Sequence, residues 1–288
     1  MLLCNKVSPE IRFFRFEHET LWEIPVVFGG SFMIDLHCHI IPGIDDGAKS
    51  AEIACAMAEN AWNTGVDTIV ATPHCNLNMA RPNYRGWDYA LAFSMFKALL
   101  KQRGIPITIL PGAEVYGRSH NIRQLIEENR LVTLNHSRYL LVEFNFGADG
   151  EYISRILDAV SHRGLIPVVA HPERYEAVQQ DPGLAQYWFS RGYIIQLNKG
   201  SILGLLGEGA QICSRELLAR GFAHVIASDA HDNHYRPTGF RELLGYLGPY
   251  VDHRYLKLLL STNPKRIISN QLIPSPGLEY LHSEEESS

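Results

Sequence analysis

The chain has 288 residues, 46% of them hydrophobic, and its 26 basic residues stand against 31 acidic ones, for a net charge of −5 with histidine neutral. This composition supports a sizeable core, argues against global disorder, and gives no electrostatic reason to expect nucleic acid or an anionic membrane as the main partner. The 5 cysteines form no Cys-x-x-Cys pair, and no apolar run approaches the roughly 18–20 residues of a membrane span, so neither a disulfide framework nor membrane insertion is expected and a cytoplasmic setting fits better.

The two ends of the chain differ in composition from its middle. A secretory signal peptide is not expected in residues 1–32, because its apolar region would be broken up by Arg12, Arg15, Glu17, His18, Glu19 and Glu23. This N-terminal extension is either an added edge segment or a stretch that translation beginning at Met33 would omit; the second is favoured, because Met33 stands immediately before the first predicted strand. Residues 276–288 form an acidic tail of a composition typical of solvated chain. The residues between, 33–275, are expected to form one domain.

Seven short apolar runs with high β propensity follow one another through the chain. They cover residues 33–39, 68–74, 107–114, 139–143, 166–171, 193–198 and 223–231. The runs end on side chains that can bind a metal or a phosphate: His37 with His39, His74, Glu114, Glu143, His171, Asn198, and Asp229 with His231. Parallel strands covered by helices form continuous apolar runs, and their catalytic groups lie at the carboxyl ends of the strands. The pattern therefore predicts a polynuclear metal site at one end of a parallel sheet.

Helical periodicity fills the gaps between these runs. Helices are predicted over residues 50–65, 87–104, 121–130, 151–164, 182–192, 210–221 and 254–268. This alternation of strands and helices, without a long linker, predicts a single distorted (β/α)7 barrel of the TIM type. A doubly wound open sheet is the alternative, but it would gather ligands at one switch point, whereas here every strand contributes.

The first run places two imidazoles on one face. Because residues i and i+2 of a strand point to the same side, His37 and His39 share a face and Cys38 points the other way. Asp229 and His231 repeat this spacing near the end of the series. A lone histidine at such a position is more often a packed core residue than a ligand, and a lone buried carboxylate is costly unless it is paired. A purely structural explanation would have to hold at every strand end independently, so the metal site is favoured.

The mixture of histidine and carboxylate ligands indicates the kind of metal and the chemistry. Such a set without thiolate favours Mn, Fe or Zn over a cysteine-rich structural zinc. About nine ligands are too many for one ion and suit a cluster of two or three, which can position a bridging hydroxide for attack at phosphorus. Arg174 and Arg236 follow two of the strand ends on loops, and guanidinium groups are suited to binding phosphate through paired hydrogen bonds, although solvated loop arginines are equally common.

At this point the motifs resemble those of a known family. The segment Asp35-Leu-His-Cys-His-Ile-Ile-Pro-Gly-Ile-Asp-Asp-Gly-Ala-Lys-Ser50 is similar to the opening of the bacterial manganese-dependent protein-tyrosine phosphatases of the PHP (polymerase and histidinol phosphatase) superfamily. These enzymes act beside capsular and exopolysaccharide synthesis. Over about residues 33–272, further motifs match in order: Thr-Pro-His74, Gly-Ala-Glu114, Val-Glu143-Phe, Ala-His171-Pro-Glu-Arg174-Tyr, Ser-Asp229-Ala-His231, Arg236-Pro and Asn263-Pro.

The resemblance implies three metal ions, of which manganese is the expected identity. It implies one ion held by His37, His39, Glu114 and Asp229, a second held by Glu114, Glu143 and His171, and a third held by Asp46, His74 and His231. Only the resemblance selects Asp46, which lies in an Asp-Asp-Gly turn beside the less favoured Asp45. The resemblance also implies that Arg174 and Arg236 bind the phosphate. The implied partner is the phosphotyrosine-bearing tail of a cytoplasmic bacterial tyrosine autokinase of polysaccharide synthesis.

Three alternatives compete with this interpretation. The segment from His74 to Arg81 satisfies His-Cys-x5-Arg, the pattern of cysteine-dependent tyrosine phosphatases, but it has no glycine and continues with proline, unlike loops that cradle phosphate around a thiolate. A small-molecule phosphatase of the histidinol-phosphate type would use the same metal cluster on another substrate. A metal-stabilised interaction module without catalysis is the third alternative.

Overall fold

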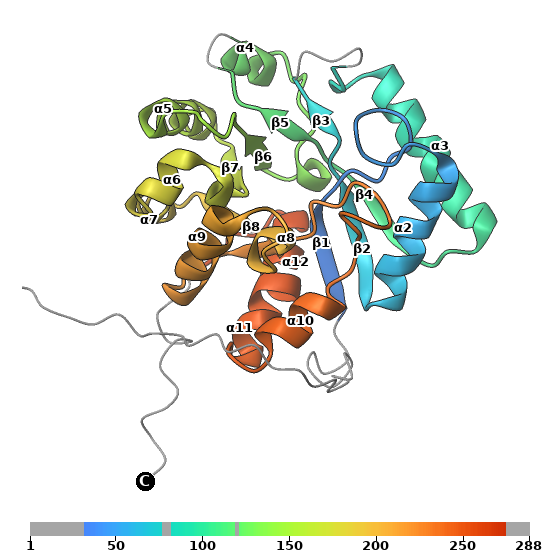
Figure 1. Cartoon of the computed structure of the whole chain (residues 1–288). Helices are drawn as coiled ribbons and strands as arrows, with labels where there is room; N and C mark the ends of the chain where they lie inside the picture. Colours follow the sequence, from blue (N-terminus) through green and yellow to red (C-terminus); the bar gives the residue numbers. More distant parts are fainter. Residues whose placement is uncertain (1–31, 77–81, 119–120, 275–288) are drawn as a thin grey trace, which may run out of the picture.

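The structure is a computed structural model that describes residues 32–76, 82–118 and 121–274 (Figure 1). Residues 1–31 of the extension, the acidic tail 276–288 and Arg81 of the His-Cys-x5-Arg pattern lie outside the described residues. The domain bounds 33–275 stay a prediction. None of the helices in the described ranges is long and apolar enough to cross a membrane.

The described ranges contain nine strands, which pair in parallel throughout. They are β1 (Met33–Cys38), β2 (Val66–Ala71), β3 (His74–Cys75), β4 (Thr108–Pro111), β5 (Glu114–Tyr116), β6 (Tyr139–Glu143), β7 (Ile166–Ala170), β8 (Ile194–Asn198) and β9 (Val225–Ala227). One sheet has the order β1-β2-β4, and the other has the order β3-β5-β6-β7-β8-β9. Each predicted apolar run therefore contains strand, in the predicted chain order.

The prediction of single strands over 68–74 and 107–114 was wrong, because each run is divided into two short strands. Pro73 separates β2 from β3, and proline has no N–H to give to a strand ladder. Gly112 lies between β4 and β5, where a Cβ would come within 2.7 Å of Cγ1 of Val70. The two divided strands are neighbours, so the breaks fall side by side and the sheet splits there.

Backbone hydrogen bonds beside the strand ends join the two sheets into a ring. The N–H of His39 donates to the carbonyl of Ala230 (2.9 Å), and the N–H of Asp229 donates to the carbonyl of His37 (2.8 Å). These bonds connect β1 to the segment that follows β9. When β2 and β3 are counted as one strand position, and β4 and β5 as another, the nine strands fill seven positions around the barrel. The expected distorted (β/α)7 barrel is confirmed, and the doubly wound sheet is not observed among the described residues.

Helices surround this ring (Figure 1). They are α2 (Ala51–Asn63), α3 (Trp87–Arg103), α4 (Ile122–Glu127), α5 (Gly150–Ser161), α6 (Glu176–Gln180), α7 (Gly183–Ser190), α8 (Lys199–Ile202), α9 (Glu208–Ala219), α10 (Arg241–Leu247), α11 (His253–Lys257) and α12 (Asn263–Ile268). The predicted helices are all present, and Ser50 caps α2 by accepting from the N–H of Ile53. α6, α8 and α10 were not predicted, because helices of 5, 4 and 7 residues are too short to show a 3.6-residue period.

Apolar side chains fill the inside of the ring and the layer between strands and helices. Strands of both sheets contribute to one inner cluster, which contains Ile34, Leu36, Val70, Tyr139, Leu141, Val168, Ile194 and Val225. α5 turns Ile153, Ile156, Leu157 and Val160 toward the strands as one buried face. Full burial of such a side chain contributes about 1.5–3 kcal/mol, so this packing gives the site a rigid frame.

His224, which lies just before β9, makes the fold sensitive to pH. The ring is 4% exposed, stacks on Phe189 at 4.7 Å, and accepts from the N–H of Ile195 through Nδ1 (3.1 Å). Burial lowers its pKa from 6.5 to about 3. Between these two values the unfolded chain binds the proton more strongly, so the free energy of unfolding is expected to fall as pH falls, by up to about 1.4 kcal/mol per pH unit.

A comparison with His224→Asn isolates this contribution. Asparagine keeps an acceptor for Ile195 but does not titrate, so the variant is expected to be less stable at pH 7 and to lose less stability between pH 6.5 and 4.5. Urea unfolding of both proteins in the presence of chelator, at several pH values, gives the two slopes. Equal slopes would contradict the expectation.

Candidate metal centre

Nine histidine, aspartate and glutamate side chains converge at the carboxyl-terminal side of the ring. They form four groups whose ligand atoms lie within 4.8 Å of one another: His39, Asp46, His74 and His231; His37, His39 and Glu114; His37, His171 and Asp229; and His74, Glu114 and Glu143. Each of the nine candidate ligands predicted from the sequence belongs to at least one group. His74 and Glu114 begin β3 and β5 instead of ending the runs that precede them, because those runs are divided.

The buried part of the cluster has the spacing of ligands around a single ion. Nε2 of His37 and Nε2 of His39 are 3.2 Å apart, and each lies 3.2 Å from an oxygen of Glu114. Oδ1 of Asp229 lies 3.4 Å from Nε2 of His37 and 3.5 Å from Nε2 of His39. With bonds of about 2.1 Å, neighbouring ligand atoms of one ion stand roughly 3.0–3.4 Å apart. Of the four side chains that the resemblance assigns to one ion, His37, His39 and Glu114 form such a set, and Asp229 borders it through Oδ1.

A second set shares Glu114 with the first. Nε2 of His171 is 2.9 Å from Oε1 of Glu114, and Nδ1 of His74 is 2.7 Å from Oε1 of Glu143 and 3.1 Å from Oε2 of Glu114. His74 thus faces the group that the resemblance assigns to Glu114, Glu143 and His171, although the resemblance puts it with Asp46 and His231.

The third set lies nearer the solvent. Oδ1 of Asp46 is 3.3 Å from Nε2 of His74 and 3.5 Å from Nε2 of His231. The side chain of Asp46 is 56% exposed, whereas His37 and His39 are fully buried. His74 therefore stands between two groups, with one ring nitrogen toward each.

Partners behind the histidines hold their rings in place. Nδ1 of His39 is 2.7 Å from Oδ2 of Asp45, which also accepts from the N–H of His74 (3.1 Å), and Nδ1 of His37 is 3.0 Å from Oε1 of Gln196. Such partners fix the ring orientation of metal-binding histidines and leave Nε2 facing the metal. Asp45 thus lies beside the cluster, behind the candidate ligand His39. Sequence reasoning missed Gln196, although an amide inside the apolar run Ile194–Asn198 is a signal in itself.

Two further polar residues support Asp229 and the strand that precedes it. Asn198, which ends its apolar run but has no place in the three implied ligand sets, donates through Nδ2 to Oδ2 of Asp229 (2.6 Å) and through its backbone N–H to Oε1 of Glu173 (2.9 Å). Asp35 accepts from the hydroxyl (2.5 Å) and the N–H (3.0 Å) of Ser228 and joins none of the metal-binding groups. Neither contact could be inferred from spacing along the chain.

The backbone is strained at two of the candidate ligands. His171 has φ 34° and Asp229 has φ 51°, values that a residue with a side chain rarely adopts. Such strain costs about 1–3 kcal/mol per residue and persists where the surrounding structure imposes it, most often at functional sites. Here it turns both side chains into the cluster.

The chemistry of this donor set fits divalent cations. Among the described residues, Nδ1 of His74, Oε1 of Glu143 and Nδ1 of His171 are buried without a hydrogen-bond partner. Burial and the charge of Glu114 raise the pKa of Glu143. Burial acts to lower the pKa of His39, but the charge of Asp45 and the hydrogen bonds with Asp229, Asp45 and Glu114 together outweigh it and raise that pKa well above its usual value. The centre thus favours positive charge, which bound cations supply.

Both predicted phosphate-binding arginines reach the edge of the cluster. Nη2 of Arg236 is 2.5 Å and Nη1 of Arg174 is 3.5 Å from Oδ2 of Asp229. The guanidinium of Arg174 lies over the ring of Phe146, 4.2 Å from its centroid, and Phe146 is itself 42% exposed. Lys199 fastens the loop after Arg236 by donating to the carbonyls of residues 237 (2.6 Å) and 239 (2.9 Å). Sequence reasoning missed Phe146 and Lys199, because nothing in their spacing marks them.

The thiolate alternative finds no support at Cys75. Its side chain is fully buried on β3, and burial raises the pKa of the thiol to about 12. A nucleophilic cysteine needs a lowered pKa and access to the substrate. The four described cysteines, Cys38, Cys55, Cys75 and Cys213, are all free and buried.

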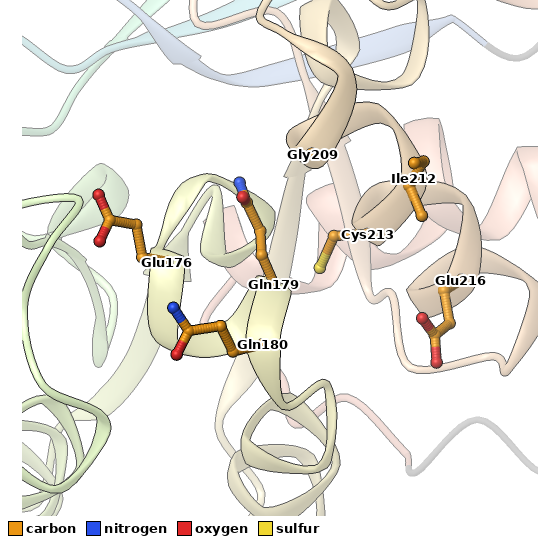
Figure 2. A pocket seen from close by; sticks show the side chains of 7 residues that line it. All are labelled: Glu176, Gln179, Gln180, Gly209, Ile212, Cys213 and Glu216. Carbon is orange, nitrogen blue, oxygen red and sulfur yellow. The ribbon is translucent and has the colours of Figure 1, made fainter.

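One other pocket, of about 370 Å³, lies between α6 and α9 (Figure 2). Its lining consists of Glu176, Gln179, Gln180, Gly209, Ile212, Cys213 and Glu216. It contains none of the nine candidate ligands, and Glu216 is already paired with Arg220 (2.6 Å). It is therefore not part of the metal centre.

Known proteins resemble this chain along most of its length. A family model described as capsular polysaccharide synthesis, CpsB/CapC, matches residues 33–269. The tyrosine-protein phosphatase YwqE of Bacillus subtilis (strain 168) is 34% identical over 243 residues, which cover 84% of this chain and 93% of YwqE. A crystal structure from work on YwqE of Bacillus subtilis and CpsB of Streptococcus pneumoniae, described as unique metal-dependent tyrosine phosphatases, matches with a TM-score of 0.76 and 32% identity, over 84% of this chain and 96% of that chain. The phosphotriesterase of Mycobacterium tuberculosis shares the fold alone, with a TM-score of 0.53 and 13% identity over 83% of this chain and 94% of that chain.

Proposed function

This chain belongs to the CpsB/CapC family of capsular polysaccharide synthesis and is a metal-dependent tyrosine-protein phosphatase, and we propose how its own residues carry out the hydrolysis. The observation that carries the proposal is the convergence of nine nitrogen and oxygen ligands at metal-ligand spacing. Two or three divalent ions would be held there, one by His37, His39, Glu114 and Asp229, one by Glu114, Glu143 and His171, and one by Asp46, His74 and His231. We propose manganese, and the donor set is equally compatible with iron or zinc.

Residues of the chain bind and orient the phosphate beside the ions. When bound, the ions supply a deprotonated water near neutral pH as nucleophile and offset the negative charge of the phosphate. Arg174 and Arg236 bind the phosphate oxygens through their guanidinium groups. Phe146 keeps the Arg174 guanidinium stacked and in place, and the loop held by Lys199 does the same for Arg236. Since the phosphate is fixed by these groups, little reorganisation is needed during reaction.

We propose that the substrate is the phosphotyrosine-bearing tail of a bacterial tyrosine autokinase of polysaccharide synthesis, met in the cytoplasm. The capsular description of the matching family supports this partner. A flexible tail suits a centre at the mouth of a barrel, because only a segment that can be threaded into the mouth reaches buried ligands. The free thiols of the described cysteines support a reducing compartment.

Turnover of matched substrates tests this proposal. The kcat/KM for a phosphotyrosyl peptide is expected to exceed that for histidinol phosphate or glycerol phosphate at least about tenfold, because Phe146 and the loop arginines offer contacts to a peptide that a small ester does not use. Cys75→Ser is expected to keep full activity with its metal in place. Faster hydrolysis of histidinol phosphate than of the peptide would favour the small-molecule alternative, and loss of turnover in metal-loaded Cys75→Ser would revive the thiolate mechanism.

A further inference from the structure

On the β3 and β5 side of the metal centre, two arginines are stacked on tyrosines instead of being paired with carboxylates. The guanidinium of Arg118 lies over the ring of Tyr116, 5.3 Å from its centroid, and that of Arg130 lies over the ring of Tyr84 at 5.1 Å. Among the described residues, no carboxylate stands within ion-pair distance of either arginine. Both arginines therefore carry positive charge that no described carboxylate pairs, on a chain whose net charge is −5; Arg130 is exposed and Arg118 is half-buried.

A single asparagine joins the two stacks. Nδ2 of Asn76 donates to the carbonyl of Tyr116 (2.9 Å), and Oδ1 of Asn76 accepts from the hydroxyl of Tyr84 (2.8 Å). The backbone N–H of Arg85 also donates to the carbonyl of Arg130 (2.7 Å). The two stacks thus form one connected surface, which we call the arginine rim: Asn76, Tyr84, Tyr116, Arg118 and Arg130.

The arginine rim is connected to candidate metal ligands along the backbone and by a hydrogen bond. Asn76 follows His74 by two residues, directly after the end of β3, and Tyr116 follows Glu114 by two residues along β5. Nδ2 of Asn83, the residue before Tyr84, donates to the carbonyl of His74 (2.8 Å). Two residues of strand span about 7 Å, a distance that two or three residues of an extended peptide also cover.

Neighbouring carboxylates do not neutralise this surface. Those at the end of α4 are engaged elsewhere: Glu127 pairs with Arg163 (2.5 Å), and Glu128, the residue after α4, accepts from the side-chain amide of Gln124 (2.7 Å). Stacking on tyrosine leaves the edge of a guanidinium free, and that edge binds carboxylates through paired hydrogen bonds.

We propose that the arginine rim binds acidic side chains that lie within about three residues of the phosphotyrosine in the substrate peptide. This inference rests on the proposed function, since it assumes a peptide whose phosphate lies at the metal centre. The rim would give sequence preference to a centre that otherwise recognises only the phosphotyrosine itself. Nucleic acid is the less favoured occupant, because the basic surface is small and the whole chain is acidic.

Two phosphotyrosyl peptides of equal length, with glutamate or glutamine at the flanking positions, test the proposal. Wild type is expected to prefer the glutamate peptide about three- to tenfold in kcat/KM, through a lower KM, and to lose the preference as salt is raised. The double variant Arg118→Gln/Arg130→Gln is expected to lose the preference while hydrolysing para-nitrophenyl phosphate at the wild-type rate. Arg155→Gln, which makes the same change on the exposed face of α5, is the matched control and is expected to keep the preference.

Several outcomes would overturn the arginine rim as a peptide site. Equal kcat/KM of wild type for the two peptides would do so, as would an undiminished preference in the folded double variant. Inhibition of wild type, but not of the double variant, by a single-stranded oligonucleotide, together with no peptide preference, would assign the rim to nucleic acid. Failure of the proposed function itself is distinguishable, because wild type would then hydrolyse neither peptide.

Discussion

Replacing Glu114 with glutamine is expected to lower kcat/KM for a phosphotyrosyl peptide by about 10²–10³-fold or more. The two oxygens of Glu114 lie within 3.2 Å of ring nitrogens from four histidines, and this carboxylate belongs to two of the four groups of candidate ligands. Glutamine keeps the shape but removes the charge, and an amide is a weaker ligand for a divalent ion. Loss of residues that only orient ligands already costs about 10–100-fold, so loss of a shared ligand should cost more. Steady-state kinetics and metal content per chain are the measurements.

Two controls make this result interpretable. Glu128→Gln makes the same chemical change at the exposed residue that follows α4, outside the cluster, and is expected to leave both kinetics and metal content within about twofold of wild type. Circular dichroism shows whether Glu114→Gln is folded. A folded Glu114→Gln protein with wild-type turnover and a full complement of metal would mean that Glu114 is not a ligand.

The second large effect is expected for Arg236→Lys. Lysine keeps the positive charge but cannot form the two parallel hydrogen bonds of a guanidinium, so kcat/KM for the phosphotyrosyl peptide should fall about 10–100-fold. Metal content should stay unchanged, because Arg236 contacts Asp229 through the oxygen that does not face His37 and His39. Kinetics and metal analysis of the same preparation separate phosphate binding from metal binding.

A matched change outside the centre controls for the substitution itself. Arg220 pairs with Glu216 on the surface, four residues away along the chain, and Arg220→Lys is expected to leave kcat/KM unchanged. Activity of Arg236→Lys within about threefold of wild type would show that Arg236 does not bind the phosphate through paired hydrogen bonds. A parallel loss of metal would instead make Arg236 a support of Asp229.

Periodicity along the chain predicts the barrel because buried parallel strands and amphipathic helices leave strong signals. Periodicity does not predict where a barrel strand is divided into two. The break at Gly112 depends on how closely the backbone passes the side chain of Val70, which is a contact between two strands and not a local property. The prediction of a single strand over 107–114 failed for this reason, whereas the run 68–74 is divided at Pro73, which lacks an N–H for the strand ladder. The strand breaks place His74 and Glu114 at the start of new strands, inside the cluster.

For the site, the residue types in the sequence reveal the candidate ligands more readily than they reveal the residues that hydrogen-bond to those ligands. Histidines and carboxylates after apolar runs are conspicuous, and all nine meet in the structure. Gln196 and Asn198 act through contacts with His37 and Asp229, residues far away along the chain. Asp45 and Asp46 are adjacent and chemically equal, and only the fold turns Asp45 behind His39 and Asp46 toward His74 and His231.

The central claim is that the converging side chains hold metal ions on which phosphatase activity depends. Metal content per chain, measured together with turnover of a phosphotyrosyl peptide before and after exhaustive chelation, tests it most directly. We expect two to three divalent ions per chain, loss of turnover on their removal, and its return when manganese is added back. Full turnover by a chain stripped of metal would contradict the claim.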